Sequence, residues 1–355
     1  MRRHADGELE AGELDGEFQP RQTSVNQPEE TMTISRRGAL AGLSALSLAS
    51  GVRAQQPFPS RPLTLIVPFP AGGPADIFGR LLAQGMSANL GKSVVVENKS
   101  GAAGVTGMDI VAKAGTDAHV IGIASASAGS IMQSLMPKMP YDPDKDLAPV
   151  VLVVKIQEVL VVNSKLGVTD FKSLIARLKA EPGKWGCSSA GTGGITHLAI
   201  ELFKRETGTE FLHVPYRGAA PATNDLLSGV VQMTILDVPV LLPHIRSGAL
   251  TALAVTSDVR APLLPDVPTI KELGFPRINS DNWYGLFAPG AASADDRARL
   301  HGAATAALKS KELVDAYTAV GGIVVGGSPE EFAAFRRAEV ARWAEVIKFA
   351  NVKLE

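Results

Sequence analysis

The chain has 355 residues, and its 35 basic and 36 acidic side chains give a formal charge of −1. This length is enough for about two domains. A hydrophobic content of 45% is too high for a disordered protein, and the near-zero charge argues against a dedicated nucleic-acid-binding protein. The single cysteine, Cys187, excludes an internal disulfide framework and any metal site built from several cysteines.

The N-terminal segment does not have the pattern of a folded domain. Residues 1–31 are rich in Asp and Glu and lack apolar periodicity, which predicts a disordered extension. Residues 32–54 resemble an export signal, because Arg36 and Arg37 precede a short uncharged run rich in Ala, Leu and Ser. The paired arginines favour the twin-arginine route, although Ala39 stands where that route usually has a bulky apolar residue. Since a signal begins its polypeptide, we expect translation from Met32, which would leave residues 1–31 untranslated.

Strands and helices alternate along the rest of the chain. Short β-rich runs predict strands at 63–67, 94–98, 120–123, within 147–162, and at 185–188, 231–236, 251–256 and 283–288. Apolar periodicity predicts helices at 75–90, 104–113, 171–179, 194–206, 222–228, 239–247, 294–308 and 329–350. This alternation over short Gly-rich joints indicates an α/β fold with parallel sheets covered by helices.

Two glycine-rich loops, residues 68–76 and 188–197, each lead from a predicted strand into a predicted helix. Unpaired N–H groups at a helix N-terminus bind anions, and glycines let a ligand approach the backbone. Facing each other, the two loops would hold a small carboxylate between two domains. Each loop alone is more often an ordinary turn. Neither has the spacing of a phosphate-binding or dinucleotide-binding loop.

A few polar residues near strand ends are further candidates. Ser125 and Ser127 could donate hydrogen bonds to a ligand or lie in a solvated turn. Asp237 could order a ligand hydroxyl or amino group, or cap the helix that follows it. Cys187, His197 and Asp237 are the only candidate catalytic triad by residue type, yet a cysteine inside an apolar strand is more often buried and inert. The scattered histidines do not form a metal-binding pattern, so we expect no metal site and no cofactor.

Several segments together resemble the tripartite tricarboxylate transporter receptor family, also called the Bug family of periplasmic solute-binding proteins. The segments are Pro59–Thr64, Val67–Asp76, Val94–Lys99, Pro140–Pro143, Val214–Gly218, Leu250–Thr256 and Trp283–Pro289. The resemblance implies a two-domain, type II periplasmic-binding-protein-like α/β fold with a ligand cleft between the domains. Domain 1 would comprise residues 55–155 plus 276–355, and domain 2 residues 156–275.

The resemblance also implies which residues would line the cleft. They are Phe69, Pro70, Ala71, Gly72, Gly73 and Asp76 from the first loop, Ser189, Ala190, Gly191, Thr192, Gly193 and His197 from the second, and Ser125, Ser127 and Asp237.

We therefore expect a monomeric periplasmic receptor that binds a small carboxylate and delivers it to the permease subunits of such a transporter. A sensory binding protein of a two-component pathway and an exported hydrolase dependent on Cys187 are the alternatives. A receptor of this kind binds its ligand without catalysing a reaction, so we expect that the protein is not an enzyme.

Overall fold

The computed structural model describes residues 58–354. The segments 1–31 and 32–54, for which a disordered extension and an export signal are predicted, lie outside the described residues. The described residues all lie in one compact unit, which contains two β-sheets.

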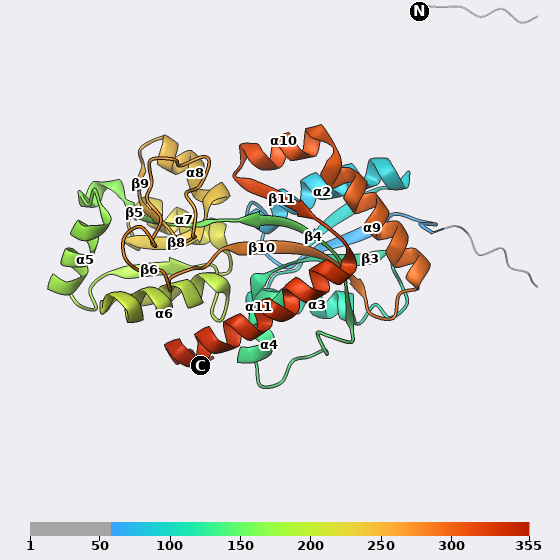
Figure 1. Ribbon diagram of the computed structural model, residues 1–355, viewed down its shortest axis with the longest axis horizontal. Coiled ribbons are helices and arrows are strands. Elements are labelled where there is room, and N and C mark those ends of the chain that lie inside the picture. The colour runs from blue at the N-terminus through green and yellow to red at the C-terminus, as the bar shows by residue number, and fades with distance from the viewer. Residues whose placement is uncertain (1–57, 355) are drawn as a thin grey trace, which may run out of the picture. The chain divides into compact units, whose positions relative to one another are not determined.

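The first sheet has six strands in the order β11-β4-β10-β3-β1-β2 (Figure 1). The strands are β1 (Leu63–Val67), β2 (Val94–Asn98), β3 (Val120–Ser125), β4 (Leu147–Ile156), β10 (Asn282–Pro289) and β11 (Gly322–Gly326). Helices α2 (Pro74–Leu90), α9 (Ala294–Lys309) and α10 (Lys311–Ala319) pack on one face. Helices α3 (Val105–Ala112), α4 (Met132–Leu135) and α11 (Pro329–Ala350) pack on the other, next to the short helices η1 (Ala102–Gly104) and η2 (Ser127–Ile131).

The second sheet has five strands in the order β7-β6-β8-β5-β9. Its strands are β5 (Glu158–Asn163), β6 (Gly186–Ser189), β7 (Leu212–Pro215), β8 (Met233–Asp237) and β9 (Leu250–Val255). Helices α5 (Phe171–Ala180) and α6 (Ile195–Thr207) cover one face, while α7 (Ala219–Ser228) and α8 (Val238–Arg246) cover the other. A short helix, η3 (Ser164–Leu166), follows β5.

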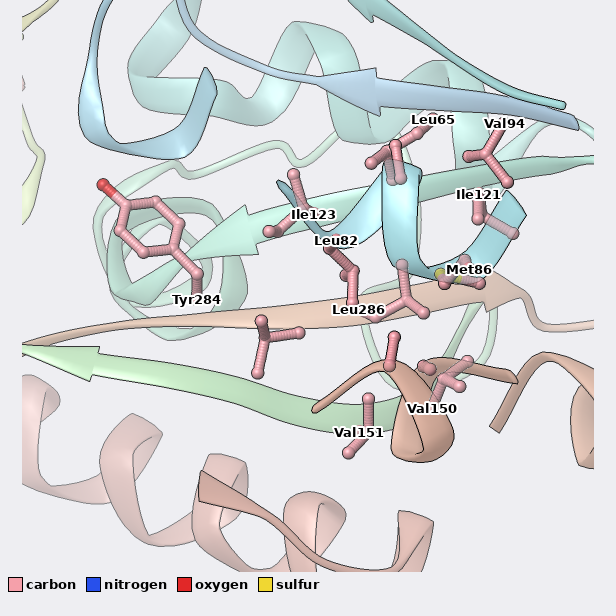
Figure 2. Packing of buried hydrophobic residues seen from close by; sticks show 14 of the residues in the cluster. Leu65, Leu82, Met86, Val94, Ile121, Ile123, Val150, Val151, Tyr284 and Leu286 are labelled. Carbon is pink, nitrogen blue, oxygen red and sulfur yellow. The ribbon is translucent and has the colours of Figure 1, made fainter. Parts of the chain in front are cut away.

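On the face of the first sheet that α2, α9 and α10 cover, the core is mainly aliphatic. Figure 2 shows the leucine, isoleucine and valine side chains of β1, β3, β4 and β10 against Leu82 and Met86 of α2. Tyr284 lies at one edge of this cluster, and its hydroxyl points away from the aliphatic side chains (Figure 2). This orientation lets the phenol oxygen form hydrogen bonds outside the apolar core.

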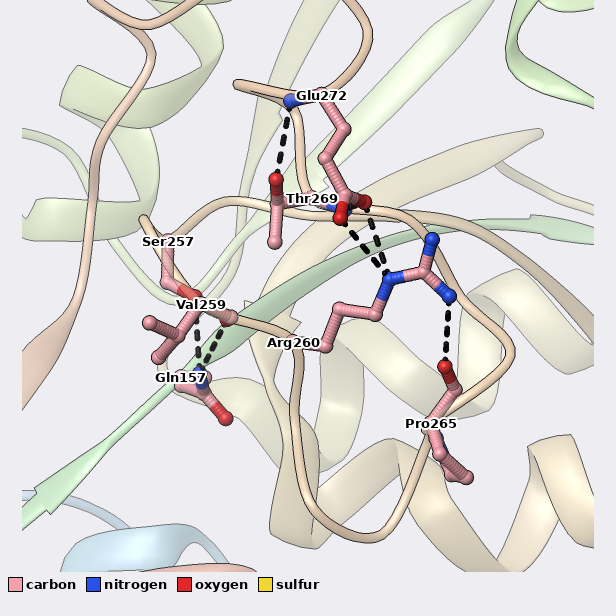
Figure 3. Close-up of polar contacts among 7 residues, drawn as sticks. All are labelled: Gln157, Ser257, Val259, Arg260, Pro265, Thr269 and Glu272. Atoms are coloured by element: carbon pink, nitrogen blue, oxygen red, sulfur yellow. Dashed lines mark hydrogen bonds and ion pairs between the residues drawn. The ribbon is translucent and has the colours of Figure 1, made fainter.

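The chain crosses between the sheets at two neighbouring places. Gln157 joins β4 to β5, and the return segment enters β10 at Asn282, which pairs with Ile156. The Gln157 Nε2 donates to Ser257 Oγ at 2.9 Å and to the carbonyl of Val259 at 2.8 Å (Figure 3). These bonds fasten the first crossing to the loop that leaves β9.

That loop is folded back on itself by a second group of contacts. The Arg260 guanidinium donates to the Glu272 carboxylate and to the Pro265 carbonyl, and the Glu272 amide donates to Thr269 Oγ1 (Figure 3). These contacts give the loop after β9 a defined shape, and the loop in turn holds Gln157 at the first crossing in place.

The prediction that the sheets are parallel is wrong in part. Only β2-β1-β3 and β7-β6-β8 pair in parallel, whereas β10 and β11 in the first sheet and β5 and β9 in the second pair antiparallel. The return crossing brings β10 back into the first sheet in the opposite direction. Local residue patterns do not encode that reversal.

Candidate ligand-binding cleft

A narrow cavity of about 30 Å³ lies between residues of the two sheets. It is lined by Phe69, Pro70, Gly73, Pro74, Ala75, Ala103, Ser125, Ser127, Ala190, Gly194, Ile195, Thr196, Ala219, Ala220, Leu236, Asp237, Asn282 and Tyr284. A space of this size holds water but not an organic acid, so a ligand needs the two sides to move apart. The parallel strands β1, β3, β6 and β8 all end at this cavity, as expected for ligand sites in α/β sheets.

The two ends of the cavity differ. Phe69, Pro70, Ala103 and Ala190 also line an outer hollow of about 500 Å³, which adds the exposed Arg217. The outer end of the cavity is therefore the side next to this hollow. In contrast, Ser125, Asp237, Asn282 and Tyr284 are buried and do not line the outer hollow, and we call them the inner end.

Three helices point their N-termini at the cavity. The first residues of α2 (Pro74, Ala75), α6 (Ile195, Thr196) and α7 (Ala219, Ala220) all belong to its lining. The first N–H groups of a helix have no partner within the helix and carry a partial positive charge. No Lys, Arg or His is among the described lining residues. Attraction for an anion must therefore come from the backbone.

The first glycine-rich loop is held from behind by Asp76. The Gly72 amide donates to Asp76 Oδ2 at 3.0 Å, and Asn98 Nδ2 donates to Oδ1 at 2.9 Å. Arg80 completes the set with a contact of 2.9 Å from Nη2 to Oδ1. Burial opposes ionisation, but hydrogen bonds from Arg80, Gly72 and Asn98 outweigh it and hold the pKa of Asp76 below its usual value. Asp76 shapes the loop and lies outside the cavity lining.

The second glycine-rich loop is held in the same way by a neutral residue. The Gly193 amide donates to His197 Nδ1 at 3.0 Å, and the Ala190 amide donates to Thr196 Oγ1 at 2.9 Å. Because Nδ1 accepts, His197 must be neutral in this arrangement. Its side chain supports the loop and does not line the cavity.

A second histidine stabilises His197. The two imidazoles of His197 and His213 stack in parallel with ring centres 4.0 Å apart, and His213 Nε2 lies 2.6 Å from Ser189 Oγ. Burial lowers the pKa of His197, and burial together with the neighbouring His197 lowers the pKa of His213 to about 3. Both rings are therefore neutral at ordinary pH.

Two contacts join the sides of the cavity. Ser127 Oγ, in the π-helical turn η2, accepts from the Ile195 amide at the start of α6 at 3.0 Å. Gly218 has a φ of +124°, and a Cβ added there would lie 2.9 Å from Pro70 Cδ. Glycine is needed at this position both for the backbone angle and for the close approach of the first loop. The structure thus has the two sides drawn together.

The inner end is a hydrogen-bonded group centred on Asp237. Asn282 Nδ2 and the Tyr284 hydroxyl each donate to the Asp237 carboxylate at 3.1 Å. Asp237 makes no side-chain capping bond to α8, so the capping alternative is wrong. Ser125 and Ser127 are buried, so a solvated turn is also wrong for them. Ser125 Oγ has no hydrogen-bond partner among the described residues.

Glu158 is an acidic residue next to this group that the residue patterns did not single out. It is the direct cross-strand partner of Asp237 on β5 and is 0% exposed. Neither carboxyl oxygen has a hydrogen-bond partner among the described residues. Burial, reinforced by the Asp237 carboxylate, raises the pKa of Glu158. A charged residue in an otherwise apolar strand is the signal that would have found it.

The sequence-derived site residues fall into three groups. Phe69, Pro70, Gly73, Ser125, Ser127, Ala190 and Asp237 line the cavity. Gly191 and Thr192 line only the outer hollow. Ala71, Gly72, Asp76, Ser189, Gly193 and His197 line neither. The other lining residues were missed: Pro74, Ala75, Ala103, Gly194, Ile195, Thr196, Ala219, Ala220, Leu236, Asn282 and Tyr284. Those of α7 had one available signal, the glycine before a helix start.

The residues of the candidate triad have separate environments. Cys187 is fully buried in the core of the second sheet, and burial raises the pKa of its thiol. His197 is engaged by Gly193 and His213, and Asp237 by Asn282 and Tyr284. Within residues 58–354, no three His, Cys, Asp or Glu side chains gather to hold a metal ion, and no helix has the length and apolar character needed to cross a membrane.

Two sheet-based halves with helix N-termini around a shared cavity define a binding protein of the periplasmic type. A family model described as "Tripartite tricarboxylate transporter family receptor" matches residues 78–352. Protein BugT of Bordetella pertussis is 38% identical over 327 residues, which cover 91% of this chain and all of BugT. The chain belongs to the tripartite tricarboxylate transporter receptor family.

Solved structures agree with this assignment. The periplasmic binding protein BugD has a TM-score of 0.80 at 33% identity, covering 84% of this chain and 100% of that chain. R. palustris Rpa4515 with adipate has a TM-score of 0.81 at 33% identity, covering 83% and 99%. MatC from Rhodopseudomonas palustris with bound malate has a TM-score of 0.78 at 29% identity, covering 82% and 100%. The predicted α/β, two-domain periplasmic-binding-protein fold is confirmed.

Proposed function

We propose that this receptor is exported to the periplasm, captures a small carboxylate in the cavity between its two sheets, and delivers it to the permease subunits of a tripartite tricarboxylate transporter. Relatives whose structures hold adipate and malate support the ligand class, and BugD, a periplasmic binding protein, supports the compartment. The family supports the permease as partner. Binding would hold the two sides together, because a ligand that contacts both favours the closed form.

The convergence of three helix N-termini on one cavity carries this proposal. A carboxylate there would receive hydrogen bonds from backbone N–H groups already fixed in place, without any basic side chain. We assign ligand contacts to the cavity lining from both loops, with Ser125, Ser127 and Asp237. The Asp76 and His197 side chains act indirectly, by keeping the loop amides in position.

The proposal includes the two domains and the absence of catalysis. Domain 1 comprises residues 55–155 plus 276–355, and domain 2 residues 156–275; the crossings at Gln157 and near Asn282, which lie close to these bounds, support the division. The protein acts as a monomer that binds and releases its ligand unchanged. The buried Cys187 thiol, with its raised pKa, is a poor nucleophile.

Isothermal titration of the full chain against a panel of small carboxylates tests the ligand class, with the corresponding primary amides as controls. We expect several acids to bind and their amides not to bind, because the helix N-termini favour negative charge. A concentration of 100 times Kd should stabilise the fold by about 2.7 kcal/mol. Failure of every acid to bind would contradict the proposal.

A matched pair of glycine variants tests closure. Gly218→Ala places a Cβ against Pro70, whereas Gly229→Ala, also at a positive φ, places one in open space. Both variants carry backbone strain, so both should lose stability. Only Gly218→Ala should weaken carboxylate binding strongly, since only it obstructs the approach of the two sides. Equal binding by the two variants would contradict capture by closure.

Co-purification with permease subunits tests the partner. The exported protein, loaded with a carboxylate found in the titration, should retain the transporter membrane subunits. Retention of the periplasmic domain of a sensor kinase instead would contradict delivery to a transporter while leaving ligand capture intact.

A further inference from the structure

The inner end of the cavity has the opposite electrostatic character to the helix N-termini. Asp237 is the only acidic side chain among the described lining residues, and no basic side chain accompanies it. It is 5% exposed, so water screens its charge poorly. An anion-binding cavity thus ends at a buried carboxyl group.

Glu158 places a second carboxyl group directly behind Asp237. The two residues are directly opposite each other on the antiparallel strands β5 and β8, and Glu158 has no hydrogen-bond partner among the described residues. Burial is the main cause that raises the pKa of both carboxyl groups, and no basic side chain counteracts it in either case. Asp237 accepts only from the uncharged donors of Asn282 and Tyr284, so no positive charge balances the ionised form of either carboxyl group.

Ser125 gives a second and independent indication of a missing partner. Its hydroxyl is buried, unpartnered among the described residues, and part of the cavity lining. Ser125 also pairs in register with Tyr284, which donates to Asp237. An acceptor and a free hydroxyl therefore lie at the same end of the cavity, and buried polar groups of this kind rarely stay without partners.

We propose that the ligand carries an ammonium group in addition to its carboxylate, and that Asp237, backed by Glu158, with Ser125 forms the subsite for that ammonium group. This inference rests on the proposed function, which places the carboxylate at the N-termini of α2, α6 and α7. The ammonium supplies the positive charge that the two carboxyl groups lack and donates to Asp237 and to Ser125 Oγ. The positive charge favours the ionised form of Asp237, whereas a second ligand carboxylate would disfavour it.

Three series of probes with matched chain lengths test the inference: ω-amino acids, the α,ω-diacids in which a carboxylate replaces the ammonium, and the unsubstituted monoacids. Calorimetry on the full chain should rank the amino acids above the other two series, by about tenfold or more. Diacids that bind as tightly as the amino acids would overturn the inference and leave the proposed function standing. Binding by none of the acids would remove the proposed function itself.

Asp237→Asn removes the charge with little change in shape and should abolish the preference for the amino acids, a loss on the order of 10- to 100-fold for that series. Asp315→Asn is the matched control, since it changes the net charge equally at an exposed position of α10. If Asp237→Asn does not fold, Glu158→Gln decides, because removing the second carboxyl should reduce the same preference. An unchanged preference in either folded variant would overturn the inference.

Discussion

In the first glycine-rich loop the Gly72 amide donates to the carboxylate of Asp76, whereas in the second the Gly193 amide donates to the imidazole of His197. The geometry is otherwise alike. Each helix starts after a glycine in extended conformation, Gly73 or Gly194, that makes no side-chain cap. Each acceptor is the third residue of its helix, and it bonds the amide just before the glycine.

The difference between the loops lies in charge. Asp76 is ionised and bonded to Arg80, while His197 is neutral and stacked on His213. The comparison shows that a polar residue beside a glycine-rich loop can hold the loop in shape without lining the cavity. It also implies that the two loops of the proposed anion site respond differently to mutation and to pH.

Asp76→Ala should have the largest effect. It removes the acceptor of the Gly72 amide and of Asn98, and hydrogen bonds to a charged group contribute about 1.5–3 kcal/mol. We expect the free energy of unfolding to fall by about 2–3 kcal/mol, measured from urea transitions. Asp76→Asn keeps an acceptor oxygen and should lose less. A loss below about 0.5 kcal/mol in Asp76→Ala would show that the loop holds its shape without the carboxylate.

His197→Ala should have a smaller effect, because it removes a hydrogen bond to a neutral acceptor and one stacked ring. We expect a loss of about 1–2 kcal/mol in the free energy of unfolding by the same measurement. His197→Asn, which can present an oxygen to the Gly193 amide, is the matched control and should recover part of it. A loss equal to that of Asp76→Ala would remove the energetic difference between the loops.

The fold was largely predictable where local residue patterns agree with the structure that the segment adopts. The strands at Leu63–Val67 and Val94–Asn98 were predicted with the observed bounds, since β-rich residues there end abruptly at turn residues. In contrast, β11 was missed because its three apolar residues lie between two pairs of glycines and were interpreted as a loop, and β7 because it has only four residues. The helix α10, which lies between α9 and β11, was also missed.

The candidate site was less predictable than the fold. The two loops could be found because glycines before a helix are a local signal. Asn282 and Tyr284 meet Asp237 from a strand about 45 residues further along the chain, and only the antiparallel return of β10 brings them there. The roles of Asp76 and His197 depend on which way a side chain points, which residue type does not determine.

Acidification should act on the second loop before the first. Burial lowers the pKa of His197, so the folded state binds fewer protons than the unfolded state, whose histidine has a pKa near about 6.5. Stability contributed by neutral His197 is thus present above about pH 6.5 and is lost as the pH falls below it. The pKa of Asp76 is lowered, so its contribution persists to well below pH 5.

Thermal unfolding between pH 7 and pH 5 measures this difference. Wild type should lose more stability than His197→Asn over that range, because only wild type has a buried neutral imidazole at this position. Burial also lowers the pKa of His213, so this residue loses stability in the same direction in both proteins. The pair Glu158 and Asp237 has raised pKa values and changes stability in the opposite direction, again in both proteins. Identical pH dependence in the two proteins would contradict a role for His197 protonation.

Arg80→Ala should have the smallest effect and shows whether the first loop depends on an ion pair or on the amide bond. Half of the Arg80 side chain is exposed, and exposed ion pairs contribute about 0–1 kcal/mol. We expect a loss of about 0.5 kcal/mol in urea unfolding and unchanged carboxylate affinity, because Gly72 and Asn98 still hold Asp76. If Arg80→Ala instead cost as much as Asp76→Ala, the ion pair would be the element that shapes the first loop. The two loops would then be alike only in their backbones. Among the described residues, His197 contacts Gly193 and His213, and neither is a cation that could correspond to Arg80.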